Sequence, residues 1–265
     1  MYYFKNKMDD FSKKLRLLVL DIIYFSKSSH IGSCFSMIEI LALIKKILRK
    51  NDSVIISKGH AAAAFYAFQY TLKKITKKDL YTYNFDNSYL SGHVTKNEIT
   101  KADFSSGSLG HGLPISLGLA ISNKFLKNIN KVYCIISDGE LNEGSTLESL
   151  YYAPSKKLDN LIVFLDNNKI QSYDLTDNVI SYKNLSSQLK LVGWRVININ
   201  NGNDLKELLK IKEIILNNKS KKPLFIICNT IKGYGVKEFE HNNLWHYKNP
   251  DYQQYLKFKK EIKNA

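Results

Sequence analysis

The second half of the chain alternates short, wholly apolar runs with segments of helical character, and this alternation constrains the fold most. The runs 132–137, 161–166 and 224–229 are apolar at consecutive positions, so both faces of each predicted strand are apolar. Such strands are buried on both faces, which is typical of parallel sheets whose connecting helices cover both sides. We therefore predict an α/β fold built on a parallel β-sheet with helices on both faces.

The chain before residue 110 is predicted to be a helical N-terminal segment. Residues 10–27 carry apolar side chains at intervals close to 3.6, which indicates an amphipathic helix. Further helices are expected over about 36–49 and 57–74, the latter with Ser57 as its N-cap. A polar, aromatic-rich loop is expected over about 84–106.

The rest of the chain continues the alternation without a repeat or a long linker. We expect a single domain, residues 1–265, with a helical part over about 1–110 and a sheet core over about 110–240. The elements expected after residue 110 are helix 112–127, strand 132–137, helix 145–157, strand 161–166, helix 184–191, strand 194–199, helix 203–217 and strand 224–229.

Composition limits the possible partners. The formal net charge is +15, yet arginine occurs only at Arg16, Arg49 and Arg195. Because base readout and bidentate phosphate binding favour arginine, we do not expect nucleic acid as a partner. No apolar stretch reaches the roughly 18 residues of a transmembrane helix. The N-terminus lacks a secretory signal pattern. We expect a cytoplasmic protein that does not enter a membrane.

Polar side chains end two of the predicted strands. Asp138 and Gly139 follow the strand at 132–137, and Asn168 ends the next one, 30 residues after Asp138. The carboxyl ends of parallel strands meet at one edge of a sheet, where ligands bind. A carboxylate and an amide oxygen suit Mg²⁺. Gly139 allows close backbone approach, and the following helix directs N–H groups at an anion. Together they predict a cradle for a metal and a diphosphate.

The ordered motifs of the chain resemble those of a known family. Asp-Gly followed about thirty residues later by Asn is similar to the thiamine-diphosphate motif, although Ser137 stands where the leading Gly is usual. Further matches narrow the resemblance to the N-terminal, diphosphate-binding half of transketolases and cover nearly the whole chain. These matches are Ser29-His-Ile-Gly32, Ser57-Lys-Gly-His60, Gly92-His93, Gly107-Ser-Leu-Gly110, Thr230-Ile-Lys-Gly-Tyr-Gly235 and Trp245-His246.

The resemblance implies a thiamine-diphosphate-binding fold and a role for each matched position. Mg²⁺ is expected to bind Asp138, Asn168 and the carbonyl oxygen of Ile170. The catalytic residues are expected to bind sugar hydroxyls and move protons, for which histidines suit neutral pH; they are His30, His93 and His246. The positions expected to bind the cofactor are His60, Gly107, Leu109, Asp138, Gly139, Glu140, Asn168 and His246.

Three glutamates carry other expectations. The resemblance places Glu143 and Glu148 at a subunit interface. Glu140 has a second possible role, because a carboxylate in the first turn of a helix is favourable and Glu140 precedes the predicted helix 145–157. Four positions depart from the family pattern and bear on the substrate: Ser172, Tyr247, Ile31 and Val94.

Transketolases also need a glutamate from a pyrimidine-binding domain, which the 265 residues do not contain. The resemblance therefore implies an N-terminal transketolase subunit that is active only with a separate C-terminal subunit, as a heterotetramer with two copies of each chain. Such an enzyme moves a two-carbon ketol unit from a ketose, or its phosphate, to an aldose, or its phosphate. Three alternatives stay open: a 2-oxo acid decarboxylase or dehydrogenase subunit, an enzyme of unusual sugar biosynthesis, and a protein without catalytic function.

Overall fold

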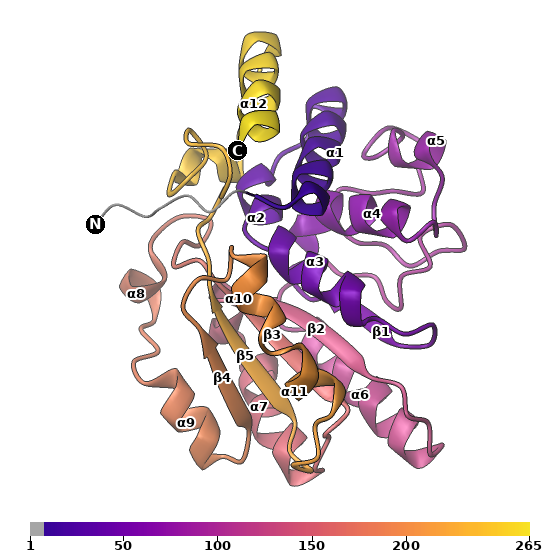
Figure 1. The fold of residues 1–265 in the computed structure, drawn as a ribbon, viewed down its shortest axis with the longest axis vertical. Helices are drawn as coiled ribbons and strands as arrows, with labels where there is room; N and C mark the ends of the chain where they lie inside the picture. Colours follow the sequence, from indigo (N-terminus) through magenta and orange to yellow (C-terminus); the bar gives the residue numbers. More distant parts are fainter. Residues whose placement is uncertain (1–7) are drawn as a thin grey trace.

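A five-stranded parallel β-sheet organises the chain in a computed structural model that describes residues 8–265. The strand order is β1-β2-β3-β5-β4 (Figure 1). The strands are β1 (Ser53–Ile56), β2 (Val132–Ser137), β3 (Leu161–Asn167), β4 (Arg195–Ile199) and β5 (Leu224–Asn229). The four strands expected after residue 110 are therefore confirmed, as is their parallel arrangement.

The edge strand β1 corrects the expectation of a wholly helical N-terminal part. It spans four residues and pairs in parallel with β2, Ser53 opposite Val132. A four-residue strand is too short to show a period of its own between two helical segments. Residues 1–7, which the expected helical part includes, lie outside the described residues.

Helices cover both faces of the sheet, as expected. On β2, Tyr133 and Ile135 join one apolar cluster, whereas Cys134 and Ile136 join the other. The helices that contribute to the first cluster include α1 (Asp10–Ser26), α2 (Ile31–Phe35), α3 (Ile38–Ile47), α4 (Ala62–Thr71), α5 (Lys77–Leu80), α10 (Leu205–Leu209), α11 (Lys212–Leu216) and α12 (Tyr252–Asn264). The second cluster includes residues of α6 (Gly112–Phe125), α7 (Gly144–Ser155) and α9 (Leu185–Leu191), while α8 (Thr176–Val179) follows β3 (Figure 1).

Two helical expectations need correction, and one helix was not expected. The helix expected over 203–217 is two helices, α10 and α11. The helix α12 begins at a capping box formed by Asp251 and Gln254 and was not expected. Ser57 does not cap α4, because the 3-10 helix η1 (Gly59–Ala61) precedes α4 and the Ser57 hydroxyl donates to Glu140 instead.

The carboxyl ends of the strands lead into the segments that carry the polar motifs. The turn after β1 contains Lys58 and η1, and β2 leads into the 3-10 helix η2 (Gly139–Asn142). The chain after β5 returns to the same edge in the 3-10 helix η3 (Asn243–His246). None of the helices formed by the described residues is long and apolar enough to cross a membrane.

Candidate active site

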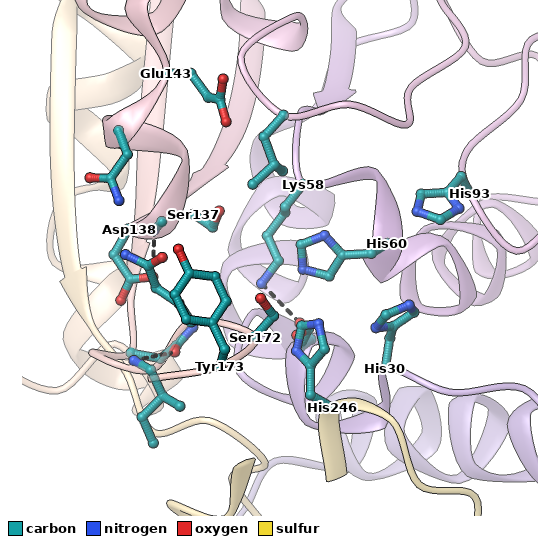
Figure 2. A pocket seen from close by; sticks show the side chains of 17 residues that line it. His30, Lys58, His60, His93, Ser137, Asp138, Glu143, Ser172, Tyr173 and His246 are labelled. Carbon is teal, nitrogen blue, oxygen red and sulfur yellow. Dashed lines mark hydrogen bonds between the residues drawn. The ribbon is translucent and has the colours of Figure 1, made fainter. Parts of the chain in front are cut away.

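A cavity of about 350 Å³ lies at this edge of the sheet and brings together ten of the positions expected to form the site. Figure 2 shows its side chains, with histidines on one side and Asp138 on the other. The ten positions that line it are His30, His60, His93, Leu109, Asp138, Gly139, Glu143, Asn168, Ile170 and His246. Gly107, Glu140 and Glu148, the other three expected positions, do not line the cavity.

The four histidines come from separate segments and form one cluster. The ring centroid of His30 lies 4.7 Å from that of His246, 5.4 Å from that of His60 and 6.1 Å from that of His93. The backbone fixes part of this arrangement, because the His30 N–H donates to the His246 carbonyl at 3.0 Å. The Ser33 hydroxyl also lies 3.3 Å from Nδ1 of His246.

Burial keeps three of these histidines uncharged at neutral pH. It lowers the pKa of His30 to about 4, helped by the charges of His93 and Lys232. Burial and Lys232 lower the pKa of His246 to about 3. The pKa of His60 also falls well below 6.5, mainly through burial. A neutral imidazole keeps one nitrogen that accepts a hydrogen bond or a proton. Among the described groups, the buried Nδ1 of His30 has no hydrogen-bond partner.

The opposite wall of the cavity carries oxygen atoms of the kind that bind metal ions. Asp138 is 2% exposed, and its carboxylate accepts from the backbone N–H groups of Gly139 at 2.8 Å and Lys169 at 2.6 Å. Burial, with a contribution from Asp166, raises the pKa of Asp138 to about 6. The amide oxygen of Asn168 accepts from the N–H of Ile170 at 3.2 Å.

A buried ion pair supports both walls. The Lys58 ammonium, which lines the cavity, is bound to the carboxylate of Asp166, and both side chains are almost fully buried. Asp166 also accepts from Asn168 Nδ2 at 3.3 Å and from the Ser36 and Thr230 hydroxyls. Because the carboxylate accepts only, the Asn168 amide presents its N–H₂ group to Asp166 and leaves its oxygen on the other side.

Glu140 lies behind the cavity wall, where it holds the glycine turn. Its carboxylate is fully buried and accepts from the Ser57 hydroxyl and from the N–H groups of Gly110 at 3.1 Å and Ser137 at 3.4 Å. The turn is tight, since Gly110 has φ +83°. Burial raises the pKa of Glu140 to about 7. Glu140 therefore joins β1, β2 and the glycine turn rather than capping α7.

The remaining expected positions differ in their surroundings. Leu109 lines the cavity, whereas Gly107 is exposed at the start of the glycine turn. Glu143 lines the cavity at the N-cap position of α7, and Glu148 is exposed on that helix. Ser172 lines the cavity; Tyr247 lies beside it, with its ring 4.9 Å from that of His246.

Six further residues line the cavity without having been expected there. They are Ser33, Lys58, Ser137, Asn142, Gln171 and Tyr173. Lys58 lies within one of the quoted histidine motifs, and Ser33 directly follows another, so their places in the sequence were the available signal. Ser137 is the last residue of β2, and the other three belong to the segments that follow β2 and β3.

The oxygen wall fits Mg²⁺ held jointly with a diphosphate. Asp138 supplies one carboxylate, Asn168 an amide oxygen and Ile170 a carbonyl, and all three line the same cavity. No cluster of three or more His, Cys, Asp or Glu residues within the described range could hold a metal. Mg²⁺ commonly takes one or two protein carboxylates and completes its shell with phosphate oxygens and water. The Lys58 ammonium lines the same cavity, with its charge paired to Asp166.

Comparisons with known proteins agree with this geometry. Residues 8–250 match the sequence model described as "Transketolase, thiamine diphosphate binding domain". An apulose-4-phosphate transketolase subunit of Phocaeicola vulgatus is 32% identical over 95% of this chain and 92% of that protein. The subunit of the same name from Actinobacillus succinogenes is 34% identical over 91% and 92%, respectively. Transketolase of Homo sapiens is 31% identical over 90% of this chain and 39% of its own length.

Solved structures give the same fold. Transketolase from Campylobacter jejuni superposes with a TM-score of 0.88 at 26% identity, covering 95% of this chain and 42% of that one. Transketolase from Leishmania mexicana, at 24% identity, supports the fold alone, with a TM-score of 0.89 over 97% of this chain and 42% of that one. The chain thus spans about two fifths of these transketolases, and the expected thiamine-diphosphate-binding fold is confirmed.

Proposed function

Because this chain belongs to the transketolase family and corresponds to its thiamine-diphosphate-binding part, we propose that it is the N-terminal subunit of a split, Mg²⁺-dependent transketolase. The reaction would move a two-carbon ketol unit from a ketose, or its phosphate, to an aldose, or its phosphate. The observation that carries the proposal is the cavity itself, where oxygen ligands for a metal face a cluster of four histidines.

The residues of the two cavity walls are proposed to bind the metal, the cofactor and the sugar. Asp138, Asn168 and the Ile170 carbonyl would hold Mg²⁺, while His60, His246 and the Gly139 backbone would contact the diphosphate, with Leu109 and Gly107 at the pyrimidine. When bound, thiamine diphosphate supplies the electron sink for breaking the bond beside the ketose carbonyl. His30, His93 and His246 would bind donor hydroxyls and accept or return protons. The neutral state of His30 and His246 at pH 7 suits this task, because an imidazolium could not accept a proton.

The partner proposal rests on the relatives and on one surface. Two relatives of similar length are named as a single subunit of a transketolase. The neighbouring helices α6 and α7, together with the residue that caps the end of α6, expose a group of apolar side chains, comprising Ile115, Ile121, Phe125, Leu126, Leu147, Tyr151 and Tyr152. Exposed apolar patches of this kind mark interaction sites. We assign this α6–α7 surface to assembly with a separate C-terminal subunit in a heterotetramer, with Glu148 within it and Glu143 between it and the cavity.

A transketolase of an unusual sugar is the second candidate. Apulose-4-phosphate is part of the printed names of two relatives. Tyr247 is 63% exposed, stands where the family pattern has glycine, and has its ring 4.9 Å from that of His246, so a substrate that reaches the histidines would pass near a phenol. The chain is proposed to act in the cytoplasm, where sugar phosphates are found.

One experiment tests both candidates. The chain is purified alone and with a co-expressed C-terminal chain that bears the missing glutamate. Turnover of ketose phosphates, apulose 4-phosphate among them, is then measured with ribose 5-phosphate or glyceraldehyde 3-phosphate as acceptors. We expect turnover by the complex alone. Turnover of pyruvate instead would replace the transketolase proposal with the 2-oxo acid alternative, and full turnover by the isolated chain would contradict the split enzyme.

The metal assignment has its own test. Asp138→Asn should abolish the rise in melting temperature that thiamine diphosphate and Mg²⁺ together produce in the isolated chain. Asp159→Asn is the matched control, because Asp159 pairs with Lys124 on the surface, away from the cavity. An unchanged response in Asp138→Asn would show that Asp138 does not bind the metal.

A further inference from the structure

The loop over residues 169–176, which follows β3 and Asn168, carries one proposed metal ligand, the Ile170 carbonyl, and closes on itself. Ile170 and Leu175 form an isolated antiparallel bridge. The Gln171 N–H donates to the Asp174 carbonyl at 2.8 Å, and the Thr176 N–H donates to the Lys169 carbonyl at 3.0 Å. Residues 170–173 line the cavity from this loop. These hydrogen bonds fix the shape of the loop. Its first residue is tied to the rest of the site, because the Lys169 N–H donates to Asp138 at 2.6 Å, and the position of residues 170–173 depends on further contacts.

Two side chains from the segment after β5 hold the loop in place. Lys232 Nζ donates to the carbonyls of Ile170 at 3.2 Å and Gln171 at 2.8 Å. Asn243 Nδ2 donates to the Ser172 carbonyl at 2.8 Å, and Asn243 Oδ1 accepts from Lys232 Nζ at 3.2 Å. Among the described residues, these two side chains supply the hydrogen bonds from outside the loop to its carbonyls at 170–172. We call them the Lys232–Asn243 clamp.

Every N–H group of the Lys232 ammonium in the clamp already has an acceptor. Lys232 is 1% exposed, and its three N–H groups have three acceptors, the carbonyls of Ile170 and Gln171 and Oδ1 of Asn243. Removing the acceptor at Asn243 would leave a buried ammonium with an unmet hydrogen bond, which is costly. The ammonium would then turn towards other acceptors and loosen its grip on the loop carbonyls. The Asn243 side chain therefore controls the hydrogen bonds to all three loop carbonyls, its own to Ser172 and those of Lys232 to Ile170 and Gln171.

The clamp also joins the two walls of the cavity. Asn243 begins η3, and His246 ends it, so both residues move with one short helical turn. The loop on the other side of the clamp carries Ile170 and begins next to Asn168, whose amide oxygen accepts from the Ile170 N–H. Because Asp138 holds the Lys169 N–H, release of the clamp would free the part of the loop after Lys169, and the Ile170 carbonyl would lose its fixed position relative to Asp138 and the histidines.

We propose that Asn243 is a positioning residue. Together with Lys232, it fixes the loop that carries Ile170 against the segment that carries His246. The clamp thereby sets the position of the metal half of the cavity (Asp138, Asn168 and Ile170) relative to the histidine half. This inference rests on the proposed function only in naming Mg²⁺ and thiamine diphosphate as the ligands. The part of the inference that concerns the position of the loop involves the chain alone and no ligand. Groups that orient metal ligands in this way typically change metal affinity by about 10- to 100-fold when they are removed.

The test compares Asn243→Ala with Asn249→Ala. Asn249 is a matched control of the same residue type on the same segment, since its Nδ2 donates to the carbonyls of Ile23 and Ser28 rather than to the loop. Amide hydrogen exchange of the peptide covering 169–176 is measured without ligand. We expect exchange about 10-fold faster or more in Asn243→Ala and unchanged in Asn249→Ala, because a local opening exposes these amides.

The second measurement is the Mg²⁺ concentration that gives half of the thermal shift at saturating thiamine diphosphate. It should rise about 10-fold in Asn243→Ala and less than about 2-fold in Asn249→Ala. Unchanged exchange in Asn243→Ala would overturn the clamp. Faster exchange with an unchanged Mg²⁺ requirement would overturn its role in setting the metal half. If the wild-type chain shows no response to the cofactor and Mg²⁺, the proposed function fails, while the exchange measurement still decides the clamp.

Discussion

Replacing Asp166 with asparagine tests the physical basis of the site most directly. The carboxylate is the ionic partner of Lys58, and both side chains are almost fully buried. Asp166→Asn keeps the shape of the side chain but leaves the Lys58 ammonium without a counter-charge. Breaking a buried pair by removing one partner costs about 3–5 kcal/mol, mostly from the uncompensated charge. That loss is a large part of a total stability of about 5–15 kcal/mol.

The assay is urea unfolding of the isolated chain followed by circular dichroism. The midpoint should fall with an unchanged slope, because the surface exposed on unfolding stays the same. Thr230→Val is the control, since it removes one hydroxyl donor to Asp166 but leaves the ion pair intact, and it should cost about 1–3 kcal/mol. The double variant Lys58→Met/Asp166→Asn should be less destabilised than Asp166→Asn alone, because the unpaired charge is gone.

Two results would contradict this reasoning. A loss below about 1 kcal/mol in Asp166→Asn would mean that Lys58 does not depend on this carboxylate for its charge balance. A double variant as unstable as the sum of the single variants would show no coupling between the two side chains.

Two further predictions concern the glycine turn and its glutamate. Burial raises the pKa of Glu140 from 4.5 to about 7, so the stability that this group contributes is present below pH 4.5 and is lost as the pH rises through 7. In denaturant titrations, the wild-type chain should therefore lose about 3 kcal/mol of stability between pH 4.5 and 7.5 relative to Glu140→Gln. Parallel curves of stability against pH for the two proteins would refute the pKa shift. Gly112→Ala should lose about 1–3 kcal/mol of stability in the same assay, because a Cβ there would overlap the Ser57 side chain that binds Glu140. The control Gly118→Ala has open space around the new Cβ and should be neutral or stabilised by up to about 1 kcal/mol. Equal losses in both variants would contradict the packing argument.

Much of the fold could be predicted because its signals are local. Continuous apolar runs predict strands that are buried on both faces, and β2, β3 and β5 fulfil that prediction. The sequence of β1 did not predict a strand, because four residues between two helical segments are too few to show a strand's pattern of apolar residues. Helix ends were less predictable for a related reason. Ser57 is a good N-cap residue by type, but its hydroxyl is used by Glu140, which is remote in the sequence.

The candidate site divides in the same way. Asp138 and Asn168 could be placed together because parallel strand ends meet at one edge, and both do line the cavity. The resemblance gave Glu140 a cofactor role, and its position also allowed a capping role. The structure buries its carboxylate behind the wall, where it accepts from Gly110 instead of capping α7, and the cofactor role stays a prediction. The role of Lys58 could not be predicted, since its partner Asp166 lies 108 residues away. Charge and spacing alone do not identify such a partner.

The sequence by itself determined the parallel α/β fold and predicted an edge suited to a metal and a diphosphate, because two-sided burial and the order of the motifs depend on neighbouring residues. Only the tertiary structure decided how the edge is held together. The strand order β1-β2-β3-β5-β4 brings the ends of β1 and β5 to either side of β2 and β3. That arrangement pairs Lys58 with Asp166 and places the Lys232–Asn243 clamp on the loop after β3. These contacts depend on distances between remote segments, which packing sets and local sequence preference does not.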